Sequence, residues 1–269
     1  MRAIQHKAEA YWFYRVVSVG YDRWINPLFW TEPMRDRALA LARLDRSDLE
    51  VVDVGAGTGF TTEAIVASVE PGRVTMIDQS PHQLAHARRK PALAACTKEI
   101  GDAENLPLAA GSVDRYVSAG SVEYWPDPPG AIAEAWRVLR PGGVALVIGP
   151  LRRRHPVARV LSDAWMLFPP QEQYVEWFRA TGFADLEIVH VAPPWWRARW
   201  DPYALAIAGR KPADATPCDG SPPPTEHAAE PITPARFARF ALGSLAGAAF
   251  IPVALWYTAL RKLRQRGRA

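Results

Sequence analysis

The chain has few residues that could crosslink it or bind a metal ion. Its 269 residues include two cysteines, Cys96 and Cys218, which lie far apart in the sequence. Two such cysteines form neither a disulfide framework nor the closely spaced pairs of a zinc site, which favours a reducing compartment. The histidine, cysteine and aspartate residues are also not spaced in the sequence like the ligands of a metal site, so we expect a reaction that needs no metal.

The chain also lacks a recognisable targeting segment and a strong charge imbalance. The N-terminal residues contain neither the apolar core of a secretory signal nor the long serine- and arginine-rich leader of a transit peptide, so we expect neither kind of targeting. The formal net charge is +4, and much of the basic excess lies at the C-terminus beside an apolar segment. That arrangement suits anionic lipid better than a nucleic-acid groove, and we expect no nucleic-acid partner.

Aromatic residues and prolines are abundant instead, with 11 tryptophans and 25 prolines. Residues 1–45 are predicted to form short helices that are broken at Asn26-Pro27 and Glu32-Pro33, because proline interrupts a helix. They carry a dense aromatic patch that runs from Tyr11 to Trp30. We predict a helical lid whose aromatic side chains line an apolar substrate site. A cap that only packs on the main domain is the alternative.

Strand and helix signals alternate over residues 46–210, which predicts one α/β domain. Helices are expected over residues 61–69, from Pro81 with Ser80 as its N-cap, over 131–139 and over 172–181. The alternation predicts right-handed βαβ units in a doubly wound, mostly parallel sheet. A short loop joins the last two strands, so we expect them to be antiparallel neighbours. The predicted strands cover residues 50–54, 73–77, 97–100, 113–118, 144–148, 186–191 and 203–208.

The C-terminal part is predicted to leave this domain. Residues 211–235 are rich in proline and small polar residues, which is typical of a linker that cannot fold alone. Residues 240–260 carry no charge and would span roughly 30 Å as a helix. Within residues 236–269 we therefore predict a membrane helix with a basic tail, which would hold the catalytic domain at the membrane surface. A buried packing helix is the alternative, and Gly243 and Gly247 are spaced for a helix-mediated dimer, although such spacings arise easily in alanine- and glycine-rich segments.

A glycine-rich turn follows the first predicted strand. In Val51-Val-Asp-Val-Gly-Ala-Gly-Thr-Gly-Phe60, three glycines alternate with other residues just before a helix is expected to begin. Glycine lets the backbone approach a ligand closely, and the start of a helix offers free N–H groups. The spacing is G-x-G-x-G rather than the dinucleotide fingerprint, and the P-loop lysine is missing. Both absences favour a nucleoside ligand without a pyrophosphate, and S-adenosylmethionine (SAM) is the leading candidate.

Three aspartates, Asp53, Asp78 and Asp102, end the first three predicted strands. The carboxyl ends of neighbouring parallel strands meet at one crevice, where ligands bind. Asp78 suits a ribose diol, because a carboxylate can accept hydrogen bonds from both hydroxyls. Asp102 and Ala103 are expected to flank the adenine, and Asp53 to meet the amino end of the methionine moiety directly or through water. The residues predicted to bind SAM are Asp53, Gly55, Ala56, Gly57, Gly59, Asp78, Gln79, Asp102, Ala103 and Ser118.

These motifs resemble those of a known superfamily and of one family within it. Residues 51–60, 78–84, 101–104 and 139–143 are similar to the motif series of class I SAM-dependent methyltransferases, which implies a Rossmann-like sheet of seven strands with the last one antiparallel. A second set of motifs extends over nearly the whole chain: Asn26-Pro27, Trp30-Thr-Glu32 and residues 78–84, 115–121, 123–128 and 165–169. These motifs resemble those of the plant and algal 2-methyl-6-phytyl-1,4-benzoquinol and 2-methyl-6-solanesyl-1,4-benzoquinol methyltransferases. This narrower resemblance implies C-methylation of a membrane-borne prenylated benzoquinol by a protein with a C-terminal membrane helix.

The implied chemistry needs a group that activates the quinol. A ring carbon ortho to a hydroxyl attacks the SAM methyl in line, and the phenol, whose pKa is about 10, loses its proton. A base or acceptor at that oxygen would raise the nucleophilicity of the ring carbon. The catalytic candidates are Glu123, Tyr124 and Asp22, with His82 behind them as a residue that shapes the adenine pocket. An ordinary capping or surface role is the alternative for each.

Other functions stay open from the sequence. Asp127-Pro128-Pro129 resembles part of the D-P-P-aromatic element of amino-methylating enzymes that act on nucleic acid, but Gly130 stands where the aromatic residue is required. A SAM-binding membrane protein without catalysis and a methyltransferase of a menaquinone or ubiquinone precursor are further alternatives. Residues 193–200 interleave tryptophan and arginine, which suits either a lipid headgroup layer or packing against the lid.

Overall fold

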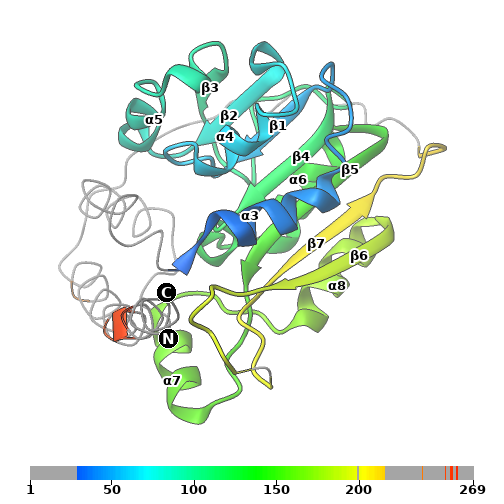
Figure 1. Cartoon of the computed structure of the whole chain (residues 1–269). Helices are drawn as coiled ribbons and strands as arrows, with labels where there is room; N and C mark the ends of the chain where they lie inside the picture. The colour runs from blue at the N-terminus through cyan, green and yellow to red at the C-terminus, as the bar shows by residue number, and fades with distance from the viewer. Residues whose placement is uncertain are drawn as a thin grey trace.

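The computed structural model describes residues 29–215 except Arg199, together with Ala238, Pro252, Leu255, Trp256 and Ala259. Its centre is a sheet of seven strands, which are β1 (Val51–Val54), β2 (Val74–Asp78), β3 (Thr97–Ile100), β4 (Val113–Ala119), β5 (Leu139–Pro150), β6 (Ala184–Val191) and β7 (Ala204–Arg210). Their order is β3-β2-β1-β4-β5-β7-β6 (Figure 1). Strands β1 to β5 pair in parallel, whereas β7 is antiparallel to both β5 and β6. The predicted mostly parallel sheet and its antiparallel last pair are therefore confirmed.

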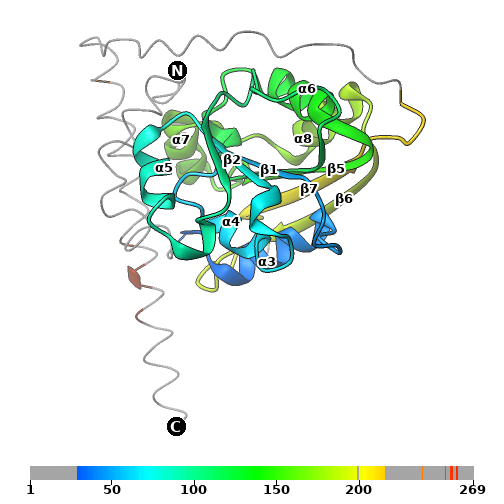
Figure 2. The same ribbon diagram turned by 90° about the horizontal axis from the view of Figure 1, so that it is seen from above.

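Helices cover both faces of the sheet. The helices are α3 (Glu32–Leu39), α4 (Phe60–Ile65), α5 (Pro81–Ala87), α6 (Pro128–Val138), α7 (Pro156–Trp165) and α8 (Gln171–Thr181). Figure 2 shows α6 and α8 on one side of the sheet and α3 and α4 on the other. Each side has its own hydrophobic core cluster, the first with side chains from α3, α4 and α5 and the second with side chains from α6 and α8. The domain is thus a sandwich of three layers, as a doubly wound sheet requires.

The central strands are apolar because both of their faces are buried. In β5, Val144, Leu146 and Ile148 pack in the first cluster, whereas Ala145 and Val147 between them pack in the second. Successive side chains of a strand point to opposite faces, so a strand covered by helices on both sides needs a continuous apolar run. All four residues of β1 are likewise buried. The one polar residue in that strand, Asp53, therefore has a specific partner, which is described below.

Helix α5 starts with the predicted capping chemistry, but one helix end and one strand start lie away from their expected positions, and one helix was not expected. Ser80 caps α5, since its hydroxyl accepts a hydrogen bond from the Gln83 N–H at 3.4 Å and Pro81 occupies the first helical position. Helix α4 ends at Ile65 rather than at residue 69. Strand β5 begins at Leu139 rather than at 144, because residues 140–143 continue it after a shift in its register with β4. Helix α7 was not predicted.

Part of the segment predicted as a lid lies on the core. Met34, Ala38 and Leu39 of α3 are buried in the first cluster, together with Ala42 of the following 3-10 turn (Ala40–Ala42). Residues 1–28, which include the catalytic candidate Asp22, lie outside the described residues. So do residues 216–235 of the predicted linker and most of the predicted membrane helix. Within the part of the chain that the structure describes, none of the helices has the length and apolar character needed to cross a bilayer.

The described domain ends with a buried lysine just after β7. The side chain of Lys211 is fully buried, and its ammonium group donates hydrogen bonds to the backbone oxygens of Trp136 and Leu139, both at 2.8 Å. Nζ also lies 5.1 Å from the centroid of the Trp136 ring. The backbone oxygen of Lys211 accepts a hydrogen bond from the Gly142 N–H, and the Lys211 N–H donates to the Gly143 oxygen. The first residue of the predicted linker is therefore part of the fold, where it fastens the end of α6.

Candidate active site

The glycine turn after β1 is tied to the end of β2. The N–H groups of Gly55 and Ala56 both donate to the backbone oxygen of Ile77, at 2.8 and 3.1 Å. Gly55 has a φ of +72°, and a Cβ at this position would lie 2.4 Å from the Cβ of Ser121. Only glycine therefore fits between the turn and the loop after β4. Gly59, whose φ is also positive, occupies the N-cap position of α4, so the turn leads directly into the helix start that was predicted.

Gly57 is the residue of the turn that faces open space. Its φ is +55°, and a Cβ built there would meet no atom within 4 Å. Its N–H donates to Oδ2 of Asp78 at 2.8 Å, while Oδ1 of the same carboxylate accepts from the Ser80 N–H at 2.8 Å. Burial raises the pKa of Asp78 to about 6, against the opposing effect of these two hydrogen bonds. Each carboxylate oxygen keeps a second lone pair, so Asp78 is able to accept from a ribose diol beside Gly57.

Asp53 lies beneath the turn rather than at its surface. The side chain is 1% exposed, and Oδ2 accepts a hydrogen bond of 2.6 Å from the hydroxyl of Thr62 in α4. Burial raises its pKa to about 7; the Thr62 hydrogen bond opposes the rise, and the charge of Asp78 adds to it. In the structure, Asp53 thus joins the end of β1 to the first turn of α4. A contact with the methionine moiety of SAM stays a prediction.

The buried carboxyl of Asp53 makes stability depend on pH. In the unfolded chain its pKa is near the ordinary value of 3.8 for an aspartate, whereas in the folded protein it is about 7. The folded state therefore holds the proton more tightly, and the stability it contributes is complete below about pH 4 and is lost as the pH rises through 7. Replacing Asp53 with asparagine, which can still accept from Thr62, should remove this loss. The free energy of unfolding of the variant should gain a few kcal/mol relative to the parent protein between pH 4 and pH 8.

Denaturant titrations across that pH range measure this difference. Asp48→Asn, at an exposed aspartate, is the matched control and should give a curve parallel to that of the parent protein. If the Asp53→Asn curve is also parallel to the parent curve, the carboxyl of Asp53 does not titrate as its burial requires.

The turn after β3 lies beside Asp78. The N–H of Gly101 donates to the backbone oxygen of Asp78 at 3.2 Å, and Oδ1 of Asp102 accepts from the Glu104 N–H at 3.0 Å. Ala103 packs against the second core cluster. The ends of β2 and β3 are thus adjacent, as predicted, while Gln79 is half-buried directly after Asp78. His82 is exposed on α5.

Three residues at this edge were missed by the sequence reasoning. Ser121 shares a hydrogen bond of 2.7 Å with the fully buried Ser118, the predicted cofactor residue in β4, and packs against Gly55. Gln83 and Asn105 each keep a buried amide oxygen without a hydrogen-bond partner, on segments that follow Asp78 and Asp102. Buried polar atoms are normally satisfied, so these two oxygens are candidates for contacts with a ligand. Their only sequence signal was proximity to a strand-ending aspartate.

Glu123 is the carboxylate with the most unusual surroundings. It lies in a 3-10 turn (Val122–Tyr124) after β4, and its Oε2 atom is buried without a hydrogen-bond partner. Burial raises its pKa to about 7. The charge of Glu123 acts on the buried hydroxyl of Tyr174, whose pKa is raised chiefly by burial and which donates to the Pro150 oxygen at 3.0 Å. A carboxylate held near neutrality and free to accept a proton is suited to general-base catalysis at physiological pH.

The sheet therefore brings most of the predicted residues to one edge. The turn with Gly57, the carboxylate of Asp78 and the Ser118–Ser121 pair surround the carboxyl ends of β1, β2 and β4. Glu123 and Tyr124 lie two and three residues after Ser121, and the Tyr124 N–H donates to the Ser121 oxygen. Asp53 supports this edge from below. Within the described part of the chain, no cluster of three or more histidine, cysteine, aspartate or glutamate side chains could hold a metal ion.

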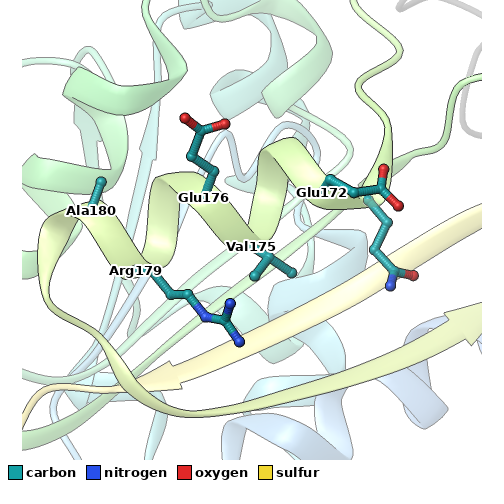
Figure 3. A pocket seen from close by; sticks show the side chains of 6 residues that line it. Glu172, Val175, Glu176, Arg179 and Ala180 are labelled. Atoms are coloured by element: carbon teal, nitrogen blue, oxygen red, sulfur yellow. The ribbon is translucent and has the colours of Figure 1, made fainter.

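A separate hollow lies on the outer face of α8 (Figure 3). Figure 3 shows the side chains of Glu176 and Arg179 extending from this helix. None of the predicted cofactor or catalytic residues lines it, so it is not part of the site. Its lining residues are Gln171, Glu172, Val175, Glu176, Arg179 and Ala180.

Comparisons with known proteins agree with this geometry. The family model described as a methyltransferase domain matches residues 52–147, which hold the glycine turn, Asp78 and Glu123. The geranyl diphosphate C-methyltransferase from Streptomyces coelicolor A3(2), solved with S-adenosyl-L-homocysteine, shares the fold, with a TM-score of 0.58, 14% identity and coverage of 67% of this chain and 77% of that one. The chain thus contains a methyltransferase domain and has the fold of that enzyme.

Two relatives are similar over almost the entire chain. The 2-methyl-6-phytyl-1,4-hydroquinone methyltransferase of Arabidopsis thaliana, named as chloroplastic, is 49% identical over 262 residues, which cover 95% of this chain and 78% of the relative. A rice protein of the same name, also chloroplastic, is 47% identical and covers 95% of this chain and 75% of its own length. Identity at this level over nearly the full length shows that the chain belongs to the 2-methyl-6-phytyl-1,4-hydroquinone methyltransferase family.

Proposed function

We propose that this protein transfers the methyl group of SAM to a ring carbon of a prenylated 1,4-hydroquinone of the tocopherol and plastoquinone type. The observation that carries the proposal is Glu123, a buried carboxylate with a pKa of about 7 and an unpartnered oxygen, next to the loop that packs on the glycine turn. The names of the two plant relatives support the substrate class.

The reaction requires one proton to be removed before the methyl is transferred. Glu123 accepts the proton of a quinol hydroxyl, so that electron density moves to the ortho ring carbon. That carbon forms a bond to the SAM methyl, the bond from methyl to sulfur breaks, and S-adenosylhomocysteine leaves as a neutral thioether. The ring carbon then loses its own proton and the hydroxyl is restored, so the overall reaction releases one proton. Holding ring and methyl in line supplies further rate enhancement.

Four further candidates have a definite place in this proposal. Asp78 holds the ribose of SAM, and Gly57 allows the backbone to approach the cofactor. Tyr124, one residue after Glu123, is the second polar group available to the quinol. Asp22, from the predicted lid, stays a proposed contact from the other side of the substrate.

The substrate is a lipid, so we include membrane association in the proposal. The uncharged residues 240–260 and the basic tail after them support a C-terminal membrane helix, and the spacing of Gly243 and Gly247 supports a helix pair. These residues are outside those described, apart from Pro252, Leu255, Trp256 and Ala259.

Product analysis tests the proposed activity. Membranes containing the full chain are incubated with methyl-labelled SAM and a panel of quinols, which includes phytyl and solanesyl benzoquinols and precursors of menaquinone and ubiquinone. We expect label in the methylated phytyl or solanesyl product, and none with membranes lacking the protein. Label only in a menaquinone or ubiquinone product would identify a different quinone methyltransferase. SAM binding without any labelled product would indicate a protein that has lost catalysis.

A further inference from the structure

Helix α7 and the loop before β7 expose apolar side chains. Val157 and Val160 of α7 are 63% and 69% exposed, and Trp200 is 57% exposed. The opposite side of the same helix faces the protein, since Ser162 is fully buried. Residues three apart lie on one side of a helix, so Val157 and Val160 form an outward stripe. Figure 1 shows α7 at the periphery of the domain, below the sheet.

The two segments are joined by hydrogen bonds at the start of α7. Nη1 of Arg154 donates to the backbone oxygen of Trp200 at 2.9 Å, and the Arg154 N–H donates to Oδ1 of Asp201 at 3.0 Å. Asp201 is 1% exposed, so it anchors this junction from inside. The exposed tryptophan therefore adjoins the exposed valines.

Trp200 differs from the other tryptophans of its loop. The Trp195 ring is buried and meets the Phe29 ring edge-on at 5.9 Å, while Trp196 lies beside the buried guanidinium of Arg153, 5.0 Å from the ring centroid. The sequence offered a headgroup contact and internal packing as alternatives for this loop. Trp195 and Trp196 pack internally, and Trp200 alone of the three is left facing solvent.

Arginines surround the exposed apolar residues. In the two segments that form this surface, residues 151–168 and 192–202, the sequence has six arginines and two acidic residues, Asp163 and Asp201. Asp163 pairs with Arg152 and Arg159, and Asp201 is buried. The solvent-facing surface of these two segments is therefore apolar and positively charged. We call it the apolar–arginine face, made of Val157, Val160, Trp200, Arg152, Arg154, Arg159 and Arg197, all of which are exposed.

This face adjoins the catalytic edge through the segment that follows α7. Before the helix, the Arg152 N–H donates to the Pro169 oxygen at 3.1 Å; after it, the Leu167 N–H donates to the backbone oxygen of Glu123 at 3.2 Å. A surface that contacts the apolar–arginine face is thus close to the segment that holds Glu123.

From these observations we infer that the apolar–arginine face docks on a lipid bilayer that carries anionic headgroups. Tryptophan, valine and arginine together are typical of segments that lie in the interface of a membrane, with the apolar side chains inserted and the arginines at the phosphates. The inference rests on the proposed function, because docking here would let a lipid quinol move from the bilayer to Glu123 without crossing water. It identifies a second membrane contact, separate from the predicted C-terminal helix.

A depth probe on α7 tests the docking. Val160→Cys in a Cys218→Ser background is labelled with an environment-sensitive fluorophore, and the full chain is reconstituted in phosphatidylcholine vesicles with or without phosphatidylglycerol. The matched control carries the label at Gln173→Cys, an exposed position on α8. The Cys218→Ser chain without an added cysteine reports any labelling of the buried Cys96. We expect the emission at position 160 to shift to the blue and to be quenched by spin-labelled lipid, more strongly with phosphatidylglycerol, while position 173 stays unchanged.

Three results would overturn the inference. They are an unchanged label at position 160, equal quenching at both positions, and a response of position 160 to duplex DNA in the absence of lipid. The readout needs no turnover, so it is independent of whether a quinol is the substrate. As a second measurement, Val157, Val160 and Trp200 are changed together to serine. The KM for a vesicle-borne prenyl-quinol should rise roughly tenfold, with kcat and the Kd for SAM unchanged.

Discussion

Replacing Glu123 with glutamine is expected to lower kcat by roughly 10²- to 10⁴-fold, the usual contribution of a general base. Glutamine keeps the size and the accepting carbonyl of the side chain but cannot take the quinol proton. The Kd for SAM should not change, because the proposed cofactor contacts are made by the glycine turn and Asp78 rather than by Glu123. Single-turnover rates with labelled SAM and a phytyl benzoquinol, together with equilibrium SAM binding, measure the two quantities separately.

The pH profile distinguishes a base from a residue that only positions the substrate. Glu123 acts as a base only when ionised, and burial raises its pKa to about 7. In the parent protein kcat should therefore rise with pH through about 7 and then level off, and in Glu123→Gln this limb should disappear. Glu172→Gln, at an exposed glutamate on α8, is the control and should keep the parent profile. Full turnover by Glu123→Gln with SAM affinity intact would exclude Glu123 as the base.

Replacing Gly57 with alanine is expected to weaken SAM binding by roughly 100-fold, which corresponds to about 2.7 kcal/mol. No atom lies within 4 Å of the added Cβ, so the folded chain has space for it. The methyl would instead stand in the crevice beside Asp78, where the cofactor is proposed to lie. Calorimetric titration with SAM measures the loss, and thermal unfolding measures any change in stability.

The control for this variant is another glycine with the same backbone constraint. Gly142 has a φ of +82°, and its added Cβ would also meet nothing within 4 Å, but it lies before the core of β5, away from the cofactor turn. A left-handed conformation costs a non-glycine residue roughly 1–2 kcal/mol, so both alanine variants should lose similar stability. Only Gly57→Ala should lose SAM affinity. Equal SAM affinity of the two variants would place the cofactor elsewhere.

The sequence was informative where local chemistry alone decides the structure. The start of α5 was predicted from Ser80 and Pro81, because an N-cap and a first-turn proline act within a few residues. The positions of Asp78 and Asp102 followed from the strand pattern, since parallel strands bring their carboxyl ends to one edge. The hydrogen bond between Gly57 and Asp78 was not predicted as such, but it is a consequence of β1 and β2 being neighbours.

Other features depended on contacts between distant residues. Nothing near Asp53 in the sequence indicates that it is buried against Thr62. The raised pKa of Glu123 comes from burial in the folded chain, so residue type alone did not distinguish it from a surface glutamate. Helix α7 was missed because its outward face is apolar, and the expected pattern of a surface helix is the reverse. That Trp195 is buried against Phe29 while Trp200 faces solvent likewise depends on contacts between residues far apart in the sequence.

The burial of Lys211 has a practical consequence for anyone who wishes to shorten the chain. The obvious place to cut is after Arg210, where β7 ends and the proline-rich stretch begins. A chain cut there loses the ammonium group that donates to the Trp136 and Leu139 oxygens where α6 passes into β5. Cutting a few residues later, after Ala215, keeps the hydrogen bonds that the Lys211 ammonium group donates. The boundary between the catalytic domain and the rest of the protein is thus set by a single side chain rather than by the last strand.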